Sequence, residues 1–149
     1  MKKLILIISL LFYSILIYSG TVIKFVESKN NIPMVTLNIG GIDRNFLVDS
    51  GSEVSLIDYD YVNSHREIIK LMYKDDVIFH TINSNNESEY TYRLIVEMAD
   101  TDVKFTTIEL SEFLGSMNKK GYKIIGLLGS DFLREHDFVI DYKNKCIRN

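Results

Sequence analysis

Apolar and polar residues alternate along much of the chain beyond residue 20, a pattern that is typical of half-buried β-strands. In the segment "MVTLNI", residues 34–39, every second side chain is apolar, and Gly40 and Gly41, which follow it, favour a tight turn. The segment "IDRNFLV", residues 42–48, then returns as a second strand. The pattern therefore predicts a β-hairpin over residues 34–48.

Further strands are predicted in the second half of the chain. Residues 77–82, 89–98 and 103–110 are rich in β-branched and aromatic residues, and we expect a three-stranded meander with turns at "NSNNES" and "ADTD". The segment "YKIIGLL", residues 122–128, ends in an apolar run that is typical of a buried strand. The segments "DFVIDY" and "KCI" near the end of the chain predict a closing hairpin.

Helical signals are fewer. Residues 59–72 carry apolar side chains at roughly helical spacing, which favours a helix there. In "SEFLGSMNKKG", Ser111 is expected to cap a short helix and Gly121 to end it, and "SDFLREH" predicts one or two further turns. Without repeats, linkers or a second domain, residues 21–149 are expected to form a single, mainly β domain with one or two short helices.

Residues 1–20 differ from the rest of the chain. Lys2 and Lys3 precede an apolar block from Leu4 to Tyr18, the pattern of an export signal. As a helix this block would span about 22 Å, less than the roughly 30 Å hydrocarbon core of a bilayer. We therefore expect a cleaved signal peptide, with an uncleaved N-terminal membrane anchor as the alternative. Both place the rest of the chain outside the cytoplasm, in the periplasm or the extracellular space.

Composition and charge narrow the range of functions. The chain has 149 residues, of which 46% are hydrophobic, so it can bury one core. Removing residues 1–20 takes away two lysines and no acids, which changes the net charge from −3 to −5. An acidic domain argues against nucleic acid as a partner. Cys146 is the only cysteine, so no disulfide can form within the chain.

Most of the sequence motifs that are typical of known catalytic sites are absent from this chain. His65, His80 and His136 are scattered, with no H-E-x-x-H motif and no cysteine pair, so we predict no metal site. The sequence also has no G-x-S-x-G elbow and no glycine-rich phosphate loop, and we expect no cofactor.

The remaining candidate is the segment "FLVDSGSEVSLID", residues 46–58, in which an apolar strand runs into Asp49. Asp-Ser-Gly by itself indicates only a turn. With an apolar strand before it and Ser52, Ser55 and apolar residues after it, the segment resembles the active-site signature of aspartic proteases. A second segment, "IIGLLGSDFL" followed by "FVIDYKNKCI", resembles the motif that closes each lobe of these enzymes, with Leu127, Leu128 and Gly129 as its apolar-apolar-glycine element.

A single aspartate motif makes the chain similar to the retropepsin-like branch of this family, whose members are single-lobed. The resemblance implies a folded β-barrel of the retropepsin-like acid protease type. It also implies a homodimer that hydrolyses polypeptides with water. Two ionised carboxylates about 4 Å apart repel by about 4 kcal/mol at an effective dielectric near 20. The two copies of Asp49 are therefore expected to share one proton, so that one acts as base and the other as acid.

The same resemblance implies roles for the neighbours of Asp49. Gly51 is expected to direct its N–H to the carboxylate, Ser50 to bond across the dimer, and Ser52 to donate to the outer carboxylate oxygen. A substrate-covering flap is expected within residues 77–95, although no glycine lies there. Asp131 is interpreted as a structural residue that complements a helix dipole.

Two alternatives remain open at this stage. The fold could serve as a catalytically silent, dimeric peptide-binding or scaffold module, which the absence of glycine from the flap favours. The chain could also be a small exported β-barrel unrelated to proteases, with Asp49 in an ordinary turn.

Overall fold

The computed structural model describes residues 20–149 except for 29–30, 75–78, 82–83, 87–91 and 99–100. The predicted segment 1–20 therefore lies, apart from Gly20, outside the described residues. Within the described part of the chain, no helix combines the length and apolar character needed to cross a membrane.

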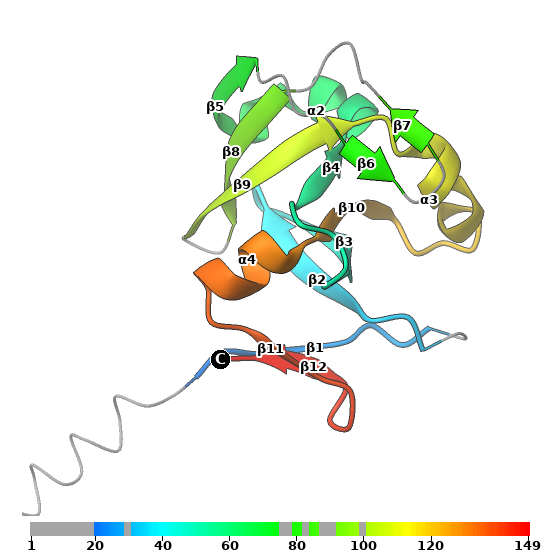
Figure 1. Ribbon diagram of the computed structural model, residues 1–149, viewed down its shortest axis with the longest axis vertical. Helices are drawn as coiled ribbons and strands as arrows, with labels where there is room; N and C mark the ends of the chain where they lie inside the picture. Colours follow the sequence, from blue (N-terminus) through cyan, green and yellow to red (C-terminus); the bar gives the residue numbers. More distant parts are fainter. Residues whose placement is uncertain (1–19, 29–30, 75–78, 82–83, 87–91, 99–100) are drawn as a thin grey trace, which may run out of the picture.

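The main element is a curled seven-stranded sheet with the strand order β2-β3-β10-β4-β9-β8-β5 (Figure 1). Its curl is visible in the pairing, because β2 also contacts β8 through Ile39 and Met98. The strands are β2 (Met34–Ile39), β3 (Ile42–Val48), β4 (Leu56–Asp58), β5 (Ile69–Lys74), β8 (Tyr92–Met98), β9 (Thr101–Ile108) and β10 (Ile124–Leu128). The mainly β fold predicted from the sequence is confirmed.

Two smaller sheets and a few short helices complete the structure. A three-stranded sheet joins β1 (Val22–Lys24), β12 (Cys146–Arg148) and β11 (Val139–Asp141), and a separate hairpin joins β6 (Phe79–Thr81) to β7 (Ser84–Asn86). The helices are α2 (Tyr59–Ser64), the 3-10 turn η1 (Arg66–Ile68), α3 (Ser111–Asn118) and α4 (Ser130–Glu135). In Figure 1, α4 lies between the curled sheet and the three-stranded sheet.

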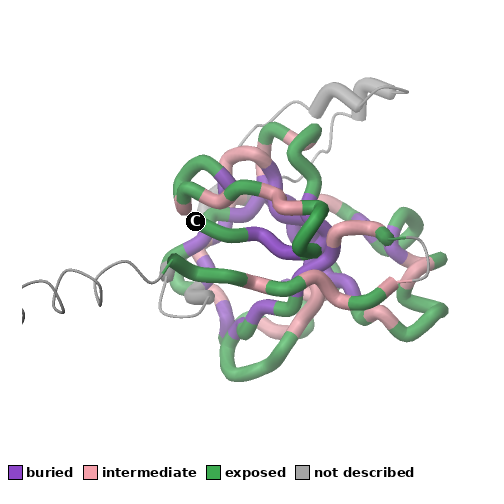
Figure 2. Tube along the Cα trace, turned by 90° about the horizontal axis from the view of Figure 1, so that it is seen from below, coloured by how far each residue is buried: buried purple, intermediate pink, exposed green. Residues whose placement is uncertain are grey.

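The end of β3 and the strand β10 are covered by apolar side chains on both faces. Their parallel pairing places Leu127 beside Leu47 and Leu128 beside Val48. Leu128 and Val48 belong to one apolar cluster, while Leu127 and Leu47 belong to a second. Strands covered on both faces are continuously apolar, which explains the runs "FLV" and "IIGLL". Figure 2 shows the buried stretches gathered in the interior and the exposed ones in the outer loops.

The predicted helix over residues 59–72 is wrong in its second half. The helix α2 ends at Ser64, and β5 begins at Ile69 and pairs with β8. Two apolar residues of this stretch, Val62 and Ile68, are buried in the core. A strand explains the later residues better because its neighbour supplies a ladder of backbone hydrogen bonds.

The predicted three-stranded meander is also only partly correct. The antiparallel pairing of β8 with β9 is confirmed, but β6 pairs with β7 in a hairpin of its own. The polar segment expected to form a turn at residues 83–88 therefore contains the strand Ser84–Asn86.

The short helix near residue 111 is present, but its start differs from the prediction. Ser111 is the first helical residue and does not cap the helix; Leu110 occupies the cap position. Asp58 caps another helix, α2, because its Oδ2 accepts from the Tyr61 N–H at 3.2 Å. Its Oδ1 accepts from the Leu110 N–H at 2.9 Å and so links the start of α3 to α2. The helix ends at Asn118 with Lys119 as its C-cap, earlier than predicted. Gly121 follows in the next turn with φ of +88°, a left-handed conformation that favours glycine.

Candidate active site

Asp49 lies immediately after β3, at the point where the buried strand ends and an exposed loop begins. Its backbone N–H donates to the Leu128 carbonyl at 3.0 Å, and the Val48 N–H before it donates to the Pro33 carbonyl at 2.9 Å. The backbone is therefore fixed on both sides, while the residue Asp49 is itself exposed. A carboxylate held by a rigid strand and open to the outside can act on a bound molecule.

The residues that follow Asp49 turn the chain tightly around the carboxylate. The Gly51 N–H donates to Asp49 Oδ1 at 2.9 Å, and the Ser52 N–H donates to the Asp49 carbonyl at 3.1 Å. A Cβ at position 51 would lie only 3.2 Å from Asp49 Oδ1, so a glycine there allows the close approach. Ser50 is exposed, and its expected bond to a second copy stays a prediction.

The expected hydrogen bond from Ser52 to the carboxylate is not present. The Ser52 hydroxyl donates instead to the Val54 carbonyl, at 2.7 Å. This bond satisfies the hydroxyl within the loop, as is common for serine in turns. Ser52 therefore supports the loop through its backbone and its hydroxyl, and the hydroxyl bonds to Val54 instead of the Asp49 carboxylate.

The apolar-apolar-glycine element lies directly against this loop. Leu127 and Leu128 form the end of β10, and Gly129 follows them with a backbone N–H that donates to the Ser55 hydroxyl at 2.9 Å. The next N–H, from Ser130, donates to the Ser52 carbonyl at 2.8 Å. The two motifs that the sequence places far apart thus form one structural unit.

One member of this unit, Ser55, belongs to the aspartate motif, but the sequence predicts no role for it. It is completely buried, and its N–H and hydroxyl both donate to the Asp131 carboxylate, at 2.9 and 2.7 Å. The sequence predicts only a helix-dipole role for Asp131, whereas its carboxylate also holds the loop. The available signal was the position of Ser55 within the aspartate motif, but its partner becomes clear only in the folded chain.

The flap prediction is tested only in part. The hairpin of β6 and β7 falls within residues 77–95, as does the start of β8, while residues 77–78, 82–83 and 87–91 of this stretch lie outside the described residues. Within the described residues, β6 and β7 pair with each other and with no strand of the curled sheet.

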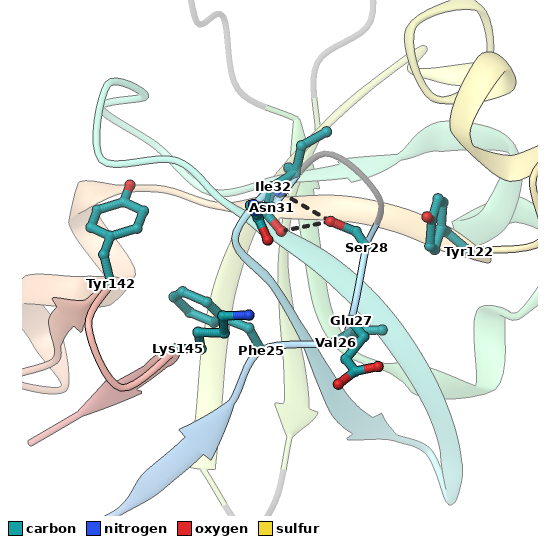
Figure 3. A pocket seen from close by; sticks show the side chains of 9 residues that line it. All are labelled: Phe25, Val26, Glu27, Ser28, Asn31, Ile32, Tyr122, Tyr142 and Lys145. Carbon is teal, nitrogen blue, oxygen red and sulfur yellow. Dashed lines mark hydrogen bonds between the residues drawn. The ribbon is translucent and has the colours of Figure 1, made fainter.

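A pocket of about 730 Å³ lies elsewhere, between the start of β2 and the C-terminal hairpin (Figure 3). Its lining combines apolar and aromatic side chains with polar and charged ones: Phe25, Val26, Ile32, Tyr122 and Tyr142, and Glu27, Ser28, Asn31 and Lys145. The Ser28 hydroxyl accepts from the Ile32 N–H at 3.0 Å and fixes the turn at its edge. No residue of the loop 49–55 lines this pocket, so it is separate from the candidate site. Within the described residues, no three acidic, histidine or cysteine side chains gather where a metal ion could bind.

No protein-family model matches the sequence, and no curated protein matches it. Solved structures do match. A retropepsin-like aspartic protease from Rickettsia conorii is 16% identical, and the likeness covers 88% of this chain and 90% of that chain with a TM-score of 0.55. At this identity the likeness establishes the fold alone. The chain therefore has a retropepsin-like fold, as its motifs predict.

Two further solved structures are similar with lower scores. The retroviral protease-like domain of Ddi1 from Leishmania major is 17% identical over 78% of this chain and 84% of that chain, with a TM-score of 0.45. The EIAV protease in complex with the inhibitor HBY-793 is 13% identical over 74% of this chain and 92% of that chain, with a TM-score of 0.49. The assignment of the fold rests on the Rickettsia structure.

Proposed function

We propose that this protein is an aspartic endopeptidase that acts as a homodimer, with one Asp49 carboxylate from each chain. The observation that carries the proposal is the exposed Asp49 at the end of a buried strand, with Gly51 bonded to its carboxylate, on a retropepsin-like fold. One carboxylate cannot accept a proton from water and donate one to the substrate carbonyl at the same time. A second copy across a twofold axis supplies the missing group.

The reaction follows from a pair of carboxylates that share one proton. The ionised Asp49 takes a proton from water as the water oxygen bonds to the carbonyl carbon, and the protonated Asp49 gives its proton to the carbonyl oxygen. The Asp49 that took the proton from water then gives it to the amide nitrogen. As the C–N bond breaks, one hydroxyl of the tetrahedral intermediate returns its proton to the carboxylate pair, which releases a carboxylic acid and an amine. The pair ends with one shared proton, and no cofactor takes part.

We further propose that the substrate is an extended polypeptide that pairs with the enzyme through its backbone. The hairpin of β6 and β7 is the candidate cover for the bound peptide. Export is part of the same proposal and rests on residues 1–20, whose charge and apolar pattern are those of a signal peptide or an N-terminal membrane tether.

The proposal is tested by incubating the purified protein with a mixed peptide library from about pH 3 to 7 and identifying the cleaved bonds. Asp49→Asn removes the reacting carboxylate, and Asp137→Asn is the matched control. Asp137 is an exposed acid with φ of +55°, a conformation that asparagine tolerates. We expect cleavage by the parent and by the control and none by Asp49→Asn, with specific activity that rises with protein concentration.

An outcome without cleavage would favour the second candidate function. If the folded, dimeric protein binds library peptides but leaves them intact, the fold serves as a peptide-binding module. The sequence feature that favours this candidate is the absence of glycine from residues 77–95.

A further inference from the structure

The Asp131 carboxylate lies between the loop that carries Asp49 and the first turn of α4. Its Oδ2 accepts from the Ser55 N–H at 2.9 Å, and its Oδ1 accepts from the Ser55 hydroxyl and from the Phe132 N–H, both at 2.7 Å. Ser55 is fully buried, so its N–H and hydroxyl have no access to water. A single side chain therefore joins the downstream end of the loop to the helix.

Ser55 extends this connection to Gly129, which lies between β10 and α4, and to the strand β9. While its hydroxyl donates to Asp131, the same oxygen accepts from the Gly129 N–H at 2.9 Å. The Ser55 carbonyl accepts from the Thr106 N–H of β9 at 2.9 Å. All three polar groups of Ser55 thus have fixed partners, which defines where the loop ends.

The upstream part of the loop is hydrogen-bonded to residues 128–131 as well. The Asp49 N–H donates to the Leu128 carbonyl at 3.0 Å, and the Ser52 carbonyl accepts from the Ser130 N–H at 2.8 Å. The Glu53 carbonyl accepts from the Asp131 N–H at 3.3 Å. The loop from Asp49 to Ser55 is therefore attached along its length to residues 128–131, and the Asp131 side chain provides its last attachment.

An aspartate is required at position 131 because both of its oxygens face backbone N–H groups. Oδ1 accepts from Phe132 and Oδ2 accepts from Ser55. An asparagine has the same shape, but one of its two terminal groups is an NH₂ donor. Whichever way the amide is oriented, one backbone N–H loses its acceptor and faces another donor, and leaving such a group unsatisfied is unfavourable.

We propose that Asp131 is a positioning residue: through Ser55 it holds the loop that presents Asp49 in the geometry needed for peptide hydrolysis. Both carboxylate oxygens of Asp131 are bonded within the protein, so its effect on the reaction passes through the loop. The inference rests on the proposed function for its catalytic consequence, because a misplacement of about 1 Å can lower a rate by about 100-fold. The structural part of the inference, that Asp131 fixes the loop, can be tested by a measurement that does not depend on peptide cleavage.

The matched control for this proposal is Asp60. It occupies the second position of α2, a helix of six residues like α4, in which Asp131 is also the second residue. Asp60 is exposed, and its side chain accepts only a long contact from the Ser111 hydroxyl at 3.4 Å. Asp60→Asn therefore reproduces the loss of a helix-dipole charge without disturbing the loop.

The experiment compares the parent protein, Asp131→Asn and Asp60→Asn under conditions in which all are folded. Amide hydrogen exchange of Gly51 and Ser52 reports the loop, since both N–H groups bond to Asp49, and peptide cleavage gives kcat and KM. For Asp131→Asn we expect loop exchange faster by about 10-fold, kcat lower by at least about 10-fold and KM within about twofold of the parent. Asp60→Asn is expected to match the parent in all three.

If Asp131→Asn does not fold, Ser55→Ala replaces it, because this variant removes only the hydroxyl that links Asp131 to Gly129, and the same changes are expected. Unchanged loop exchange and kcat in the folded variant would overturn the proposal. If the parent itself cleaves no peptide, the proposed function fails, and hydrogen exchange alone then decides whether Asp131 fixes the loop.

Discussion

Replacing Gly129 by alanine should force the Asp49 loop away from the end of β10. A Cβ at position 129 would lie 2.6 Å from both the carbonyl carbon and the oxygen of Val54, and 3.0 Å from the Ser52 carbonyl oxygen. These atoms belong to the backbone, so no side-chain rotation can relieve the contact. The φ of Gly129 is −87°, which any residue adopts, so the expected effect is steric and not conformational.

The magnitude follows from the contacts that must change. Overpacking of this kind costs about 1–3 kcal/mol. Moving the loop also weakens two hydrogen bonds, from Gly129 to the Ser55 hydroxyl and from Ser130 to the Ser52 carbonyl, at about 0.5–1.5 kcal/mol each. We therefore expect Gly129→Ala to lower the free energy of unfolding by about 3 kcal/mol and to lower cleavage activity with it.

Urea unfolding followed by circular dichroism measures this change, with Gly115→Ala as the control. Gly115 lies inside α3, and a Cβ there would meet no atom within 4 Å. Because alanine is a better helix former than glycine, the control should be stabilised by up to about 1 kcal/mol. A Gly129→Ala protein within about 0.5 kcal/mol of the parent would refute the steric argument and the tight apposition of the two motifs.

Three further predictions concern the core, the C-terminal turn and the loop. Phe46 is fully buried and stacked on another ring, so Phe46→Ala should lower the free energy of unfolding by about 3–5 kcal/mol in urea titrations, and a loss below about 1 kcal/mol would contradict its place in the core. Hydrogen bonds from Asn144 lower the pKa of Asp141 from 3.8 to about 2. Because the folded pKa is the lower one, the Asp141 carboxylate stabilises the fold above pH 3.8, and this contribution is lost as the pH falls through about 2. Unfolding titrations between these pH values should show a smaller loss of stability for Asp141→Asn than for the parent, and equal losses would contradict the assignment. Since the Ser52 hydroxyl bonds to Val54 and not to the carboxylate, Ser52→Ala should leave the pH optimum of cleavage in place, whereas a clear shift would restore the contact expected from the sequence.

Local patterns predicted the parts of the fold that local interactions determine. The hairpin of residues 34–48 and the buried strand Ile124–Leu128 follow from alternation and from a continuous apolar run. The strand Ile69–Lys74 was mistaken for helix because its apolar residues also fit a helical spacing. Its strand conformation depends on pairing with Tyr92–Met98, a partner that the sequence alone does not identify.

The contacts of the candidate site are also of two kinds, those within one sequence motif and those that depend on the folded chain. Asp49 and Gly51 belong to one contiguous motif, so their proximity could be predicted. The bond between Ser55 and Asp131 joins residues that are 76 positions apart, and it exists because β10 pairs with both β3 and β4. The Ser52 hydroxyl was assigned to the wrong acceptor because a backbone carbonyl two residues away competes with the carboxylate.

The central claim, that two copies of Asp49 form one active site, is tested most directly by mixing subunits. The parent protein is combined with increasing amounts of Asp49→Asn, at a total concentration at which the chains are dimeric and exchange freely. If each active dimer needs two Asp49 residues, an equal mixture leaves about one quarter of the dimers active, and activity per parent chain falls to about half. If each chain acts alone, activity per parent chain stays constant at every ratio, and that result would contradict the paired-carboxylate account.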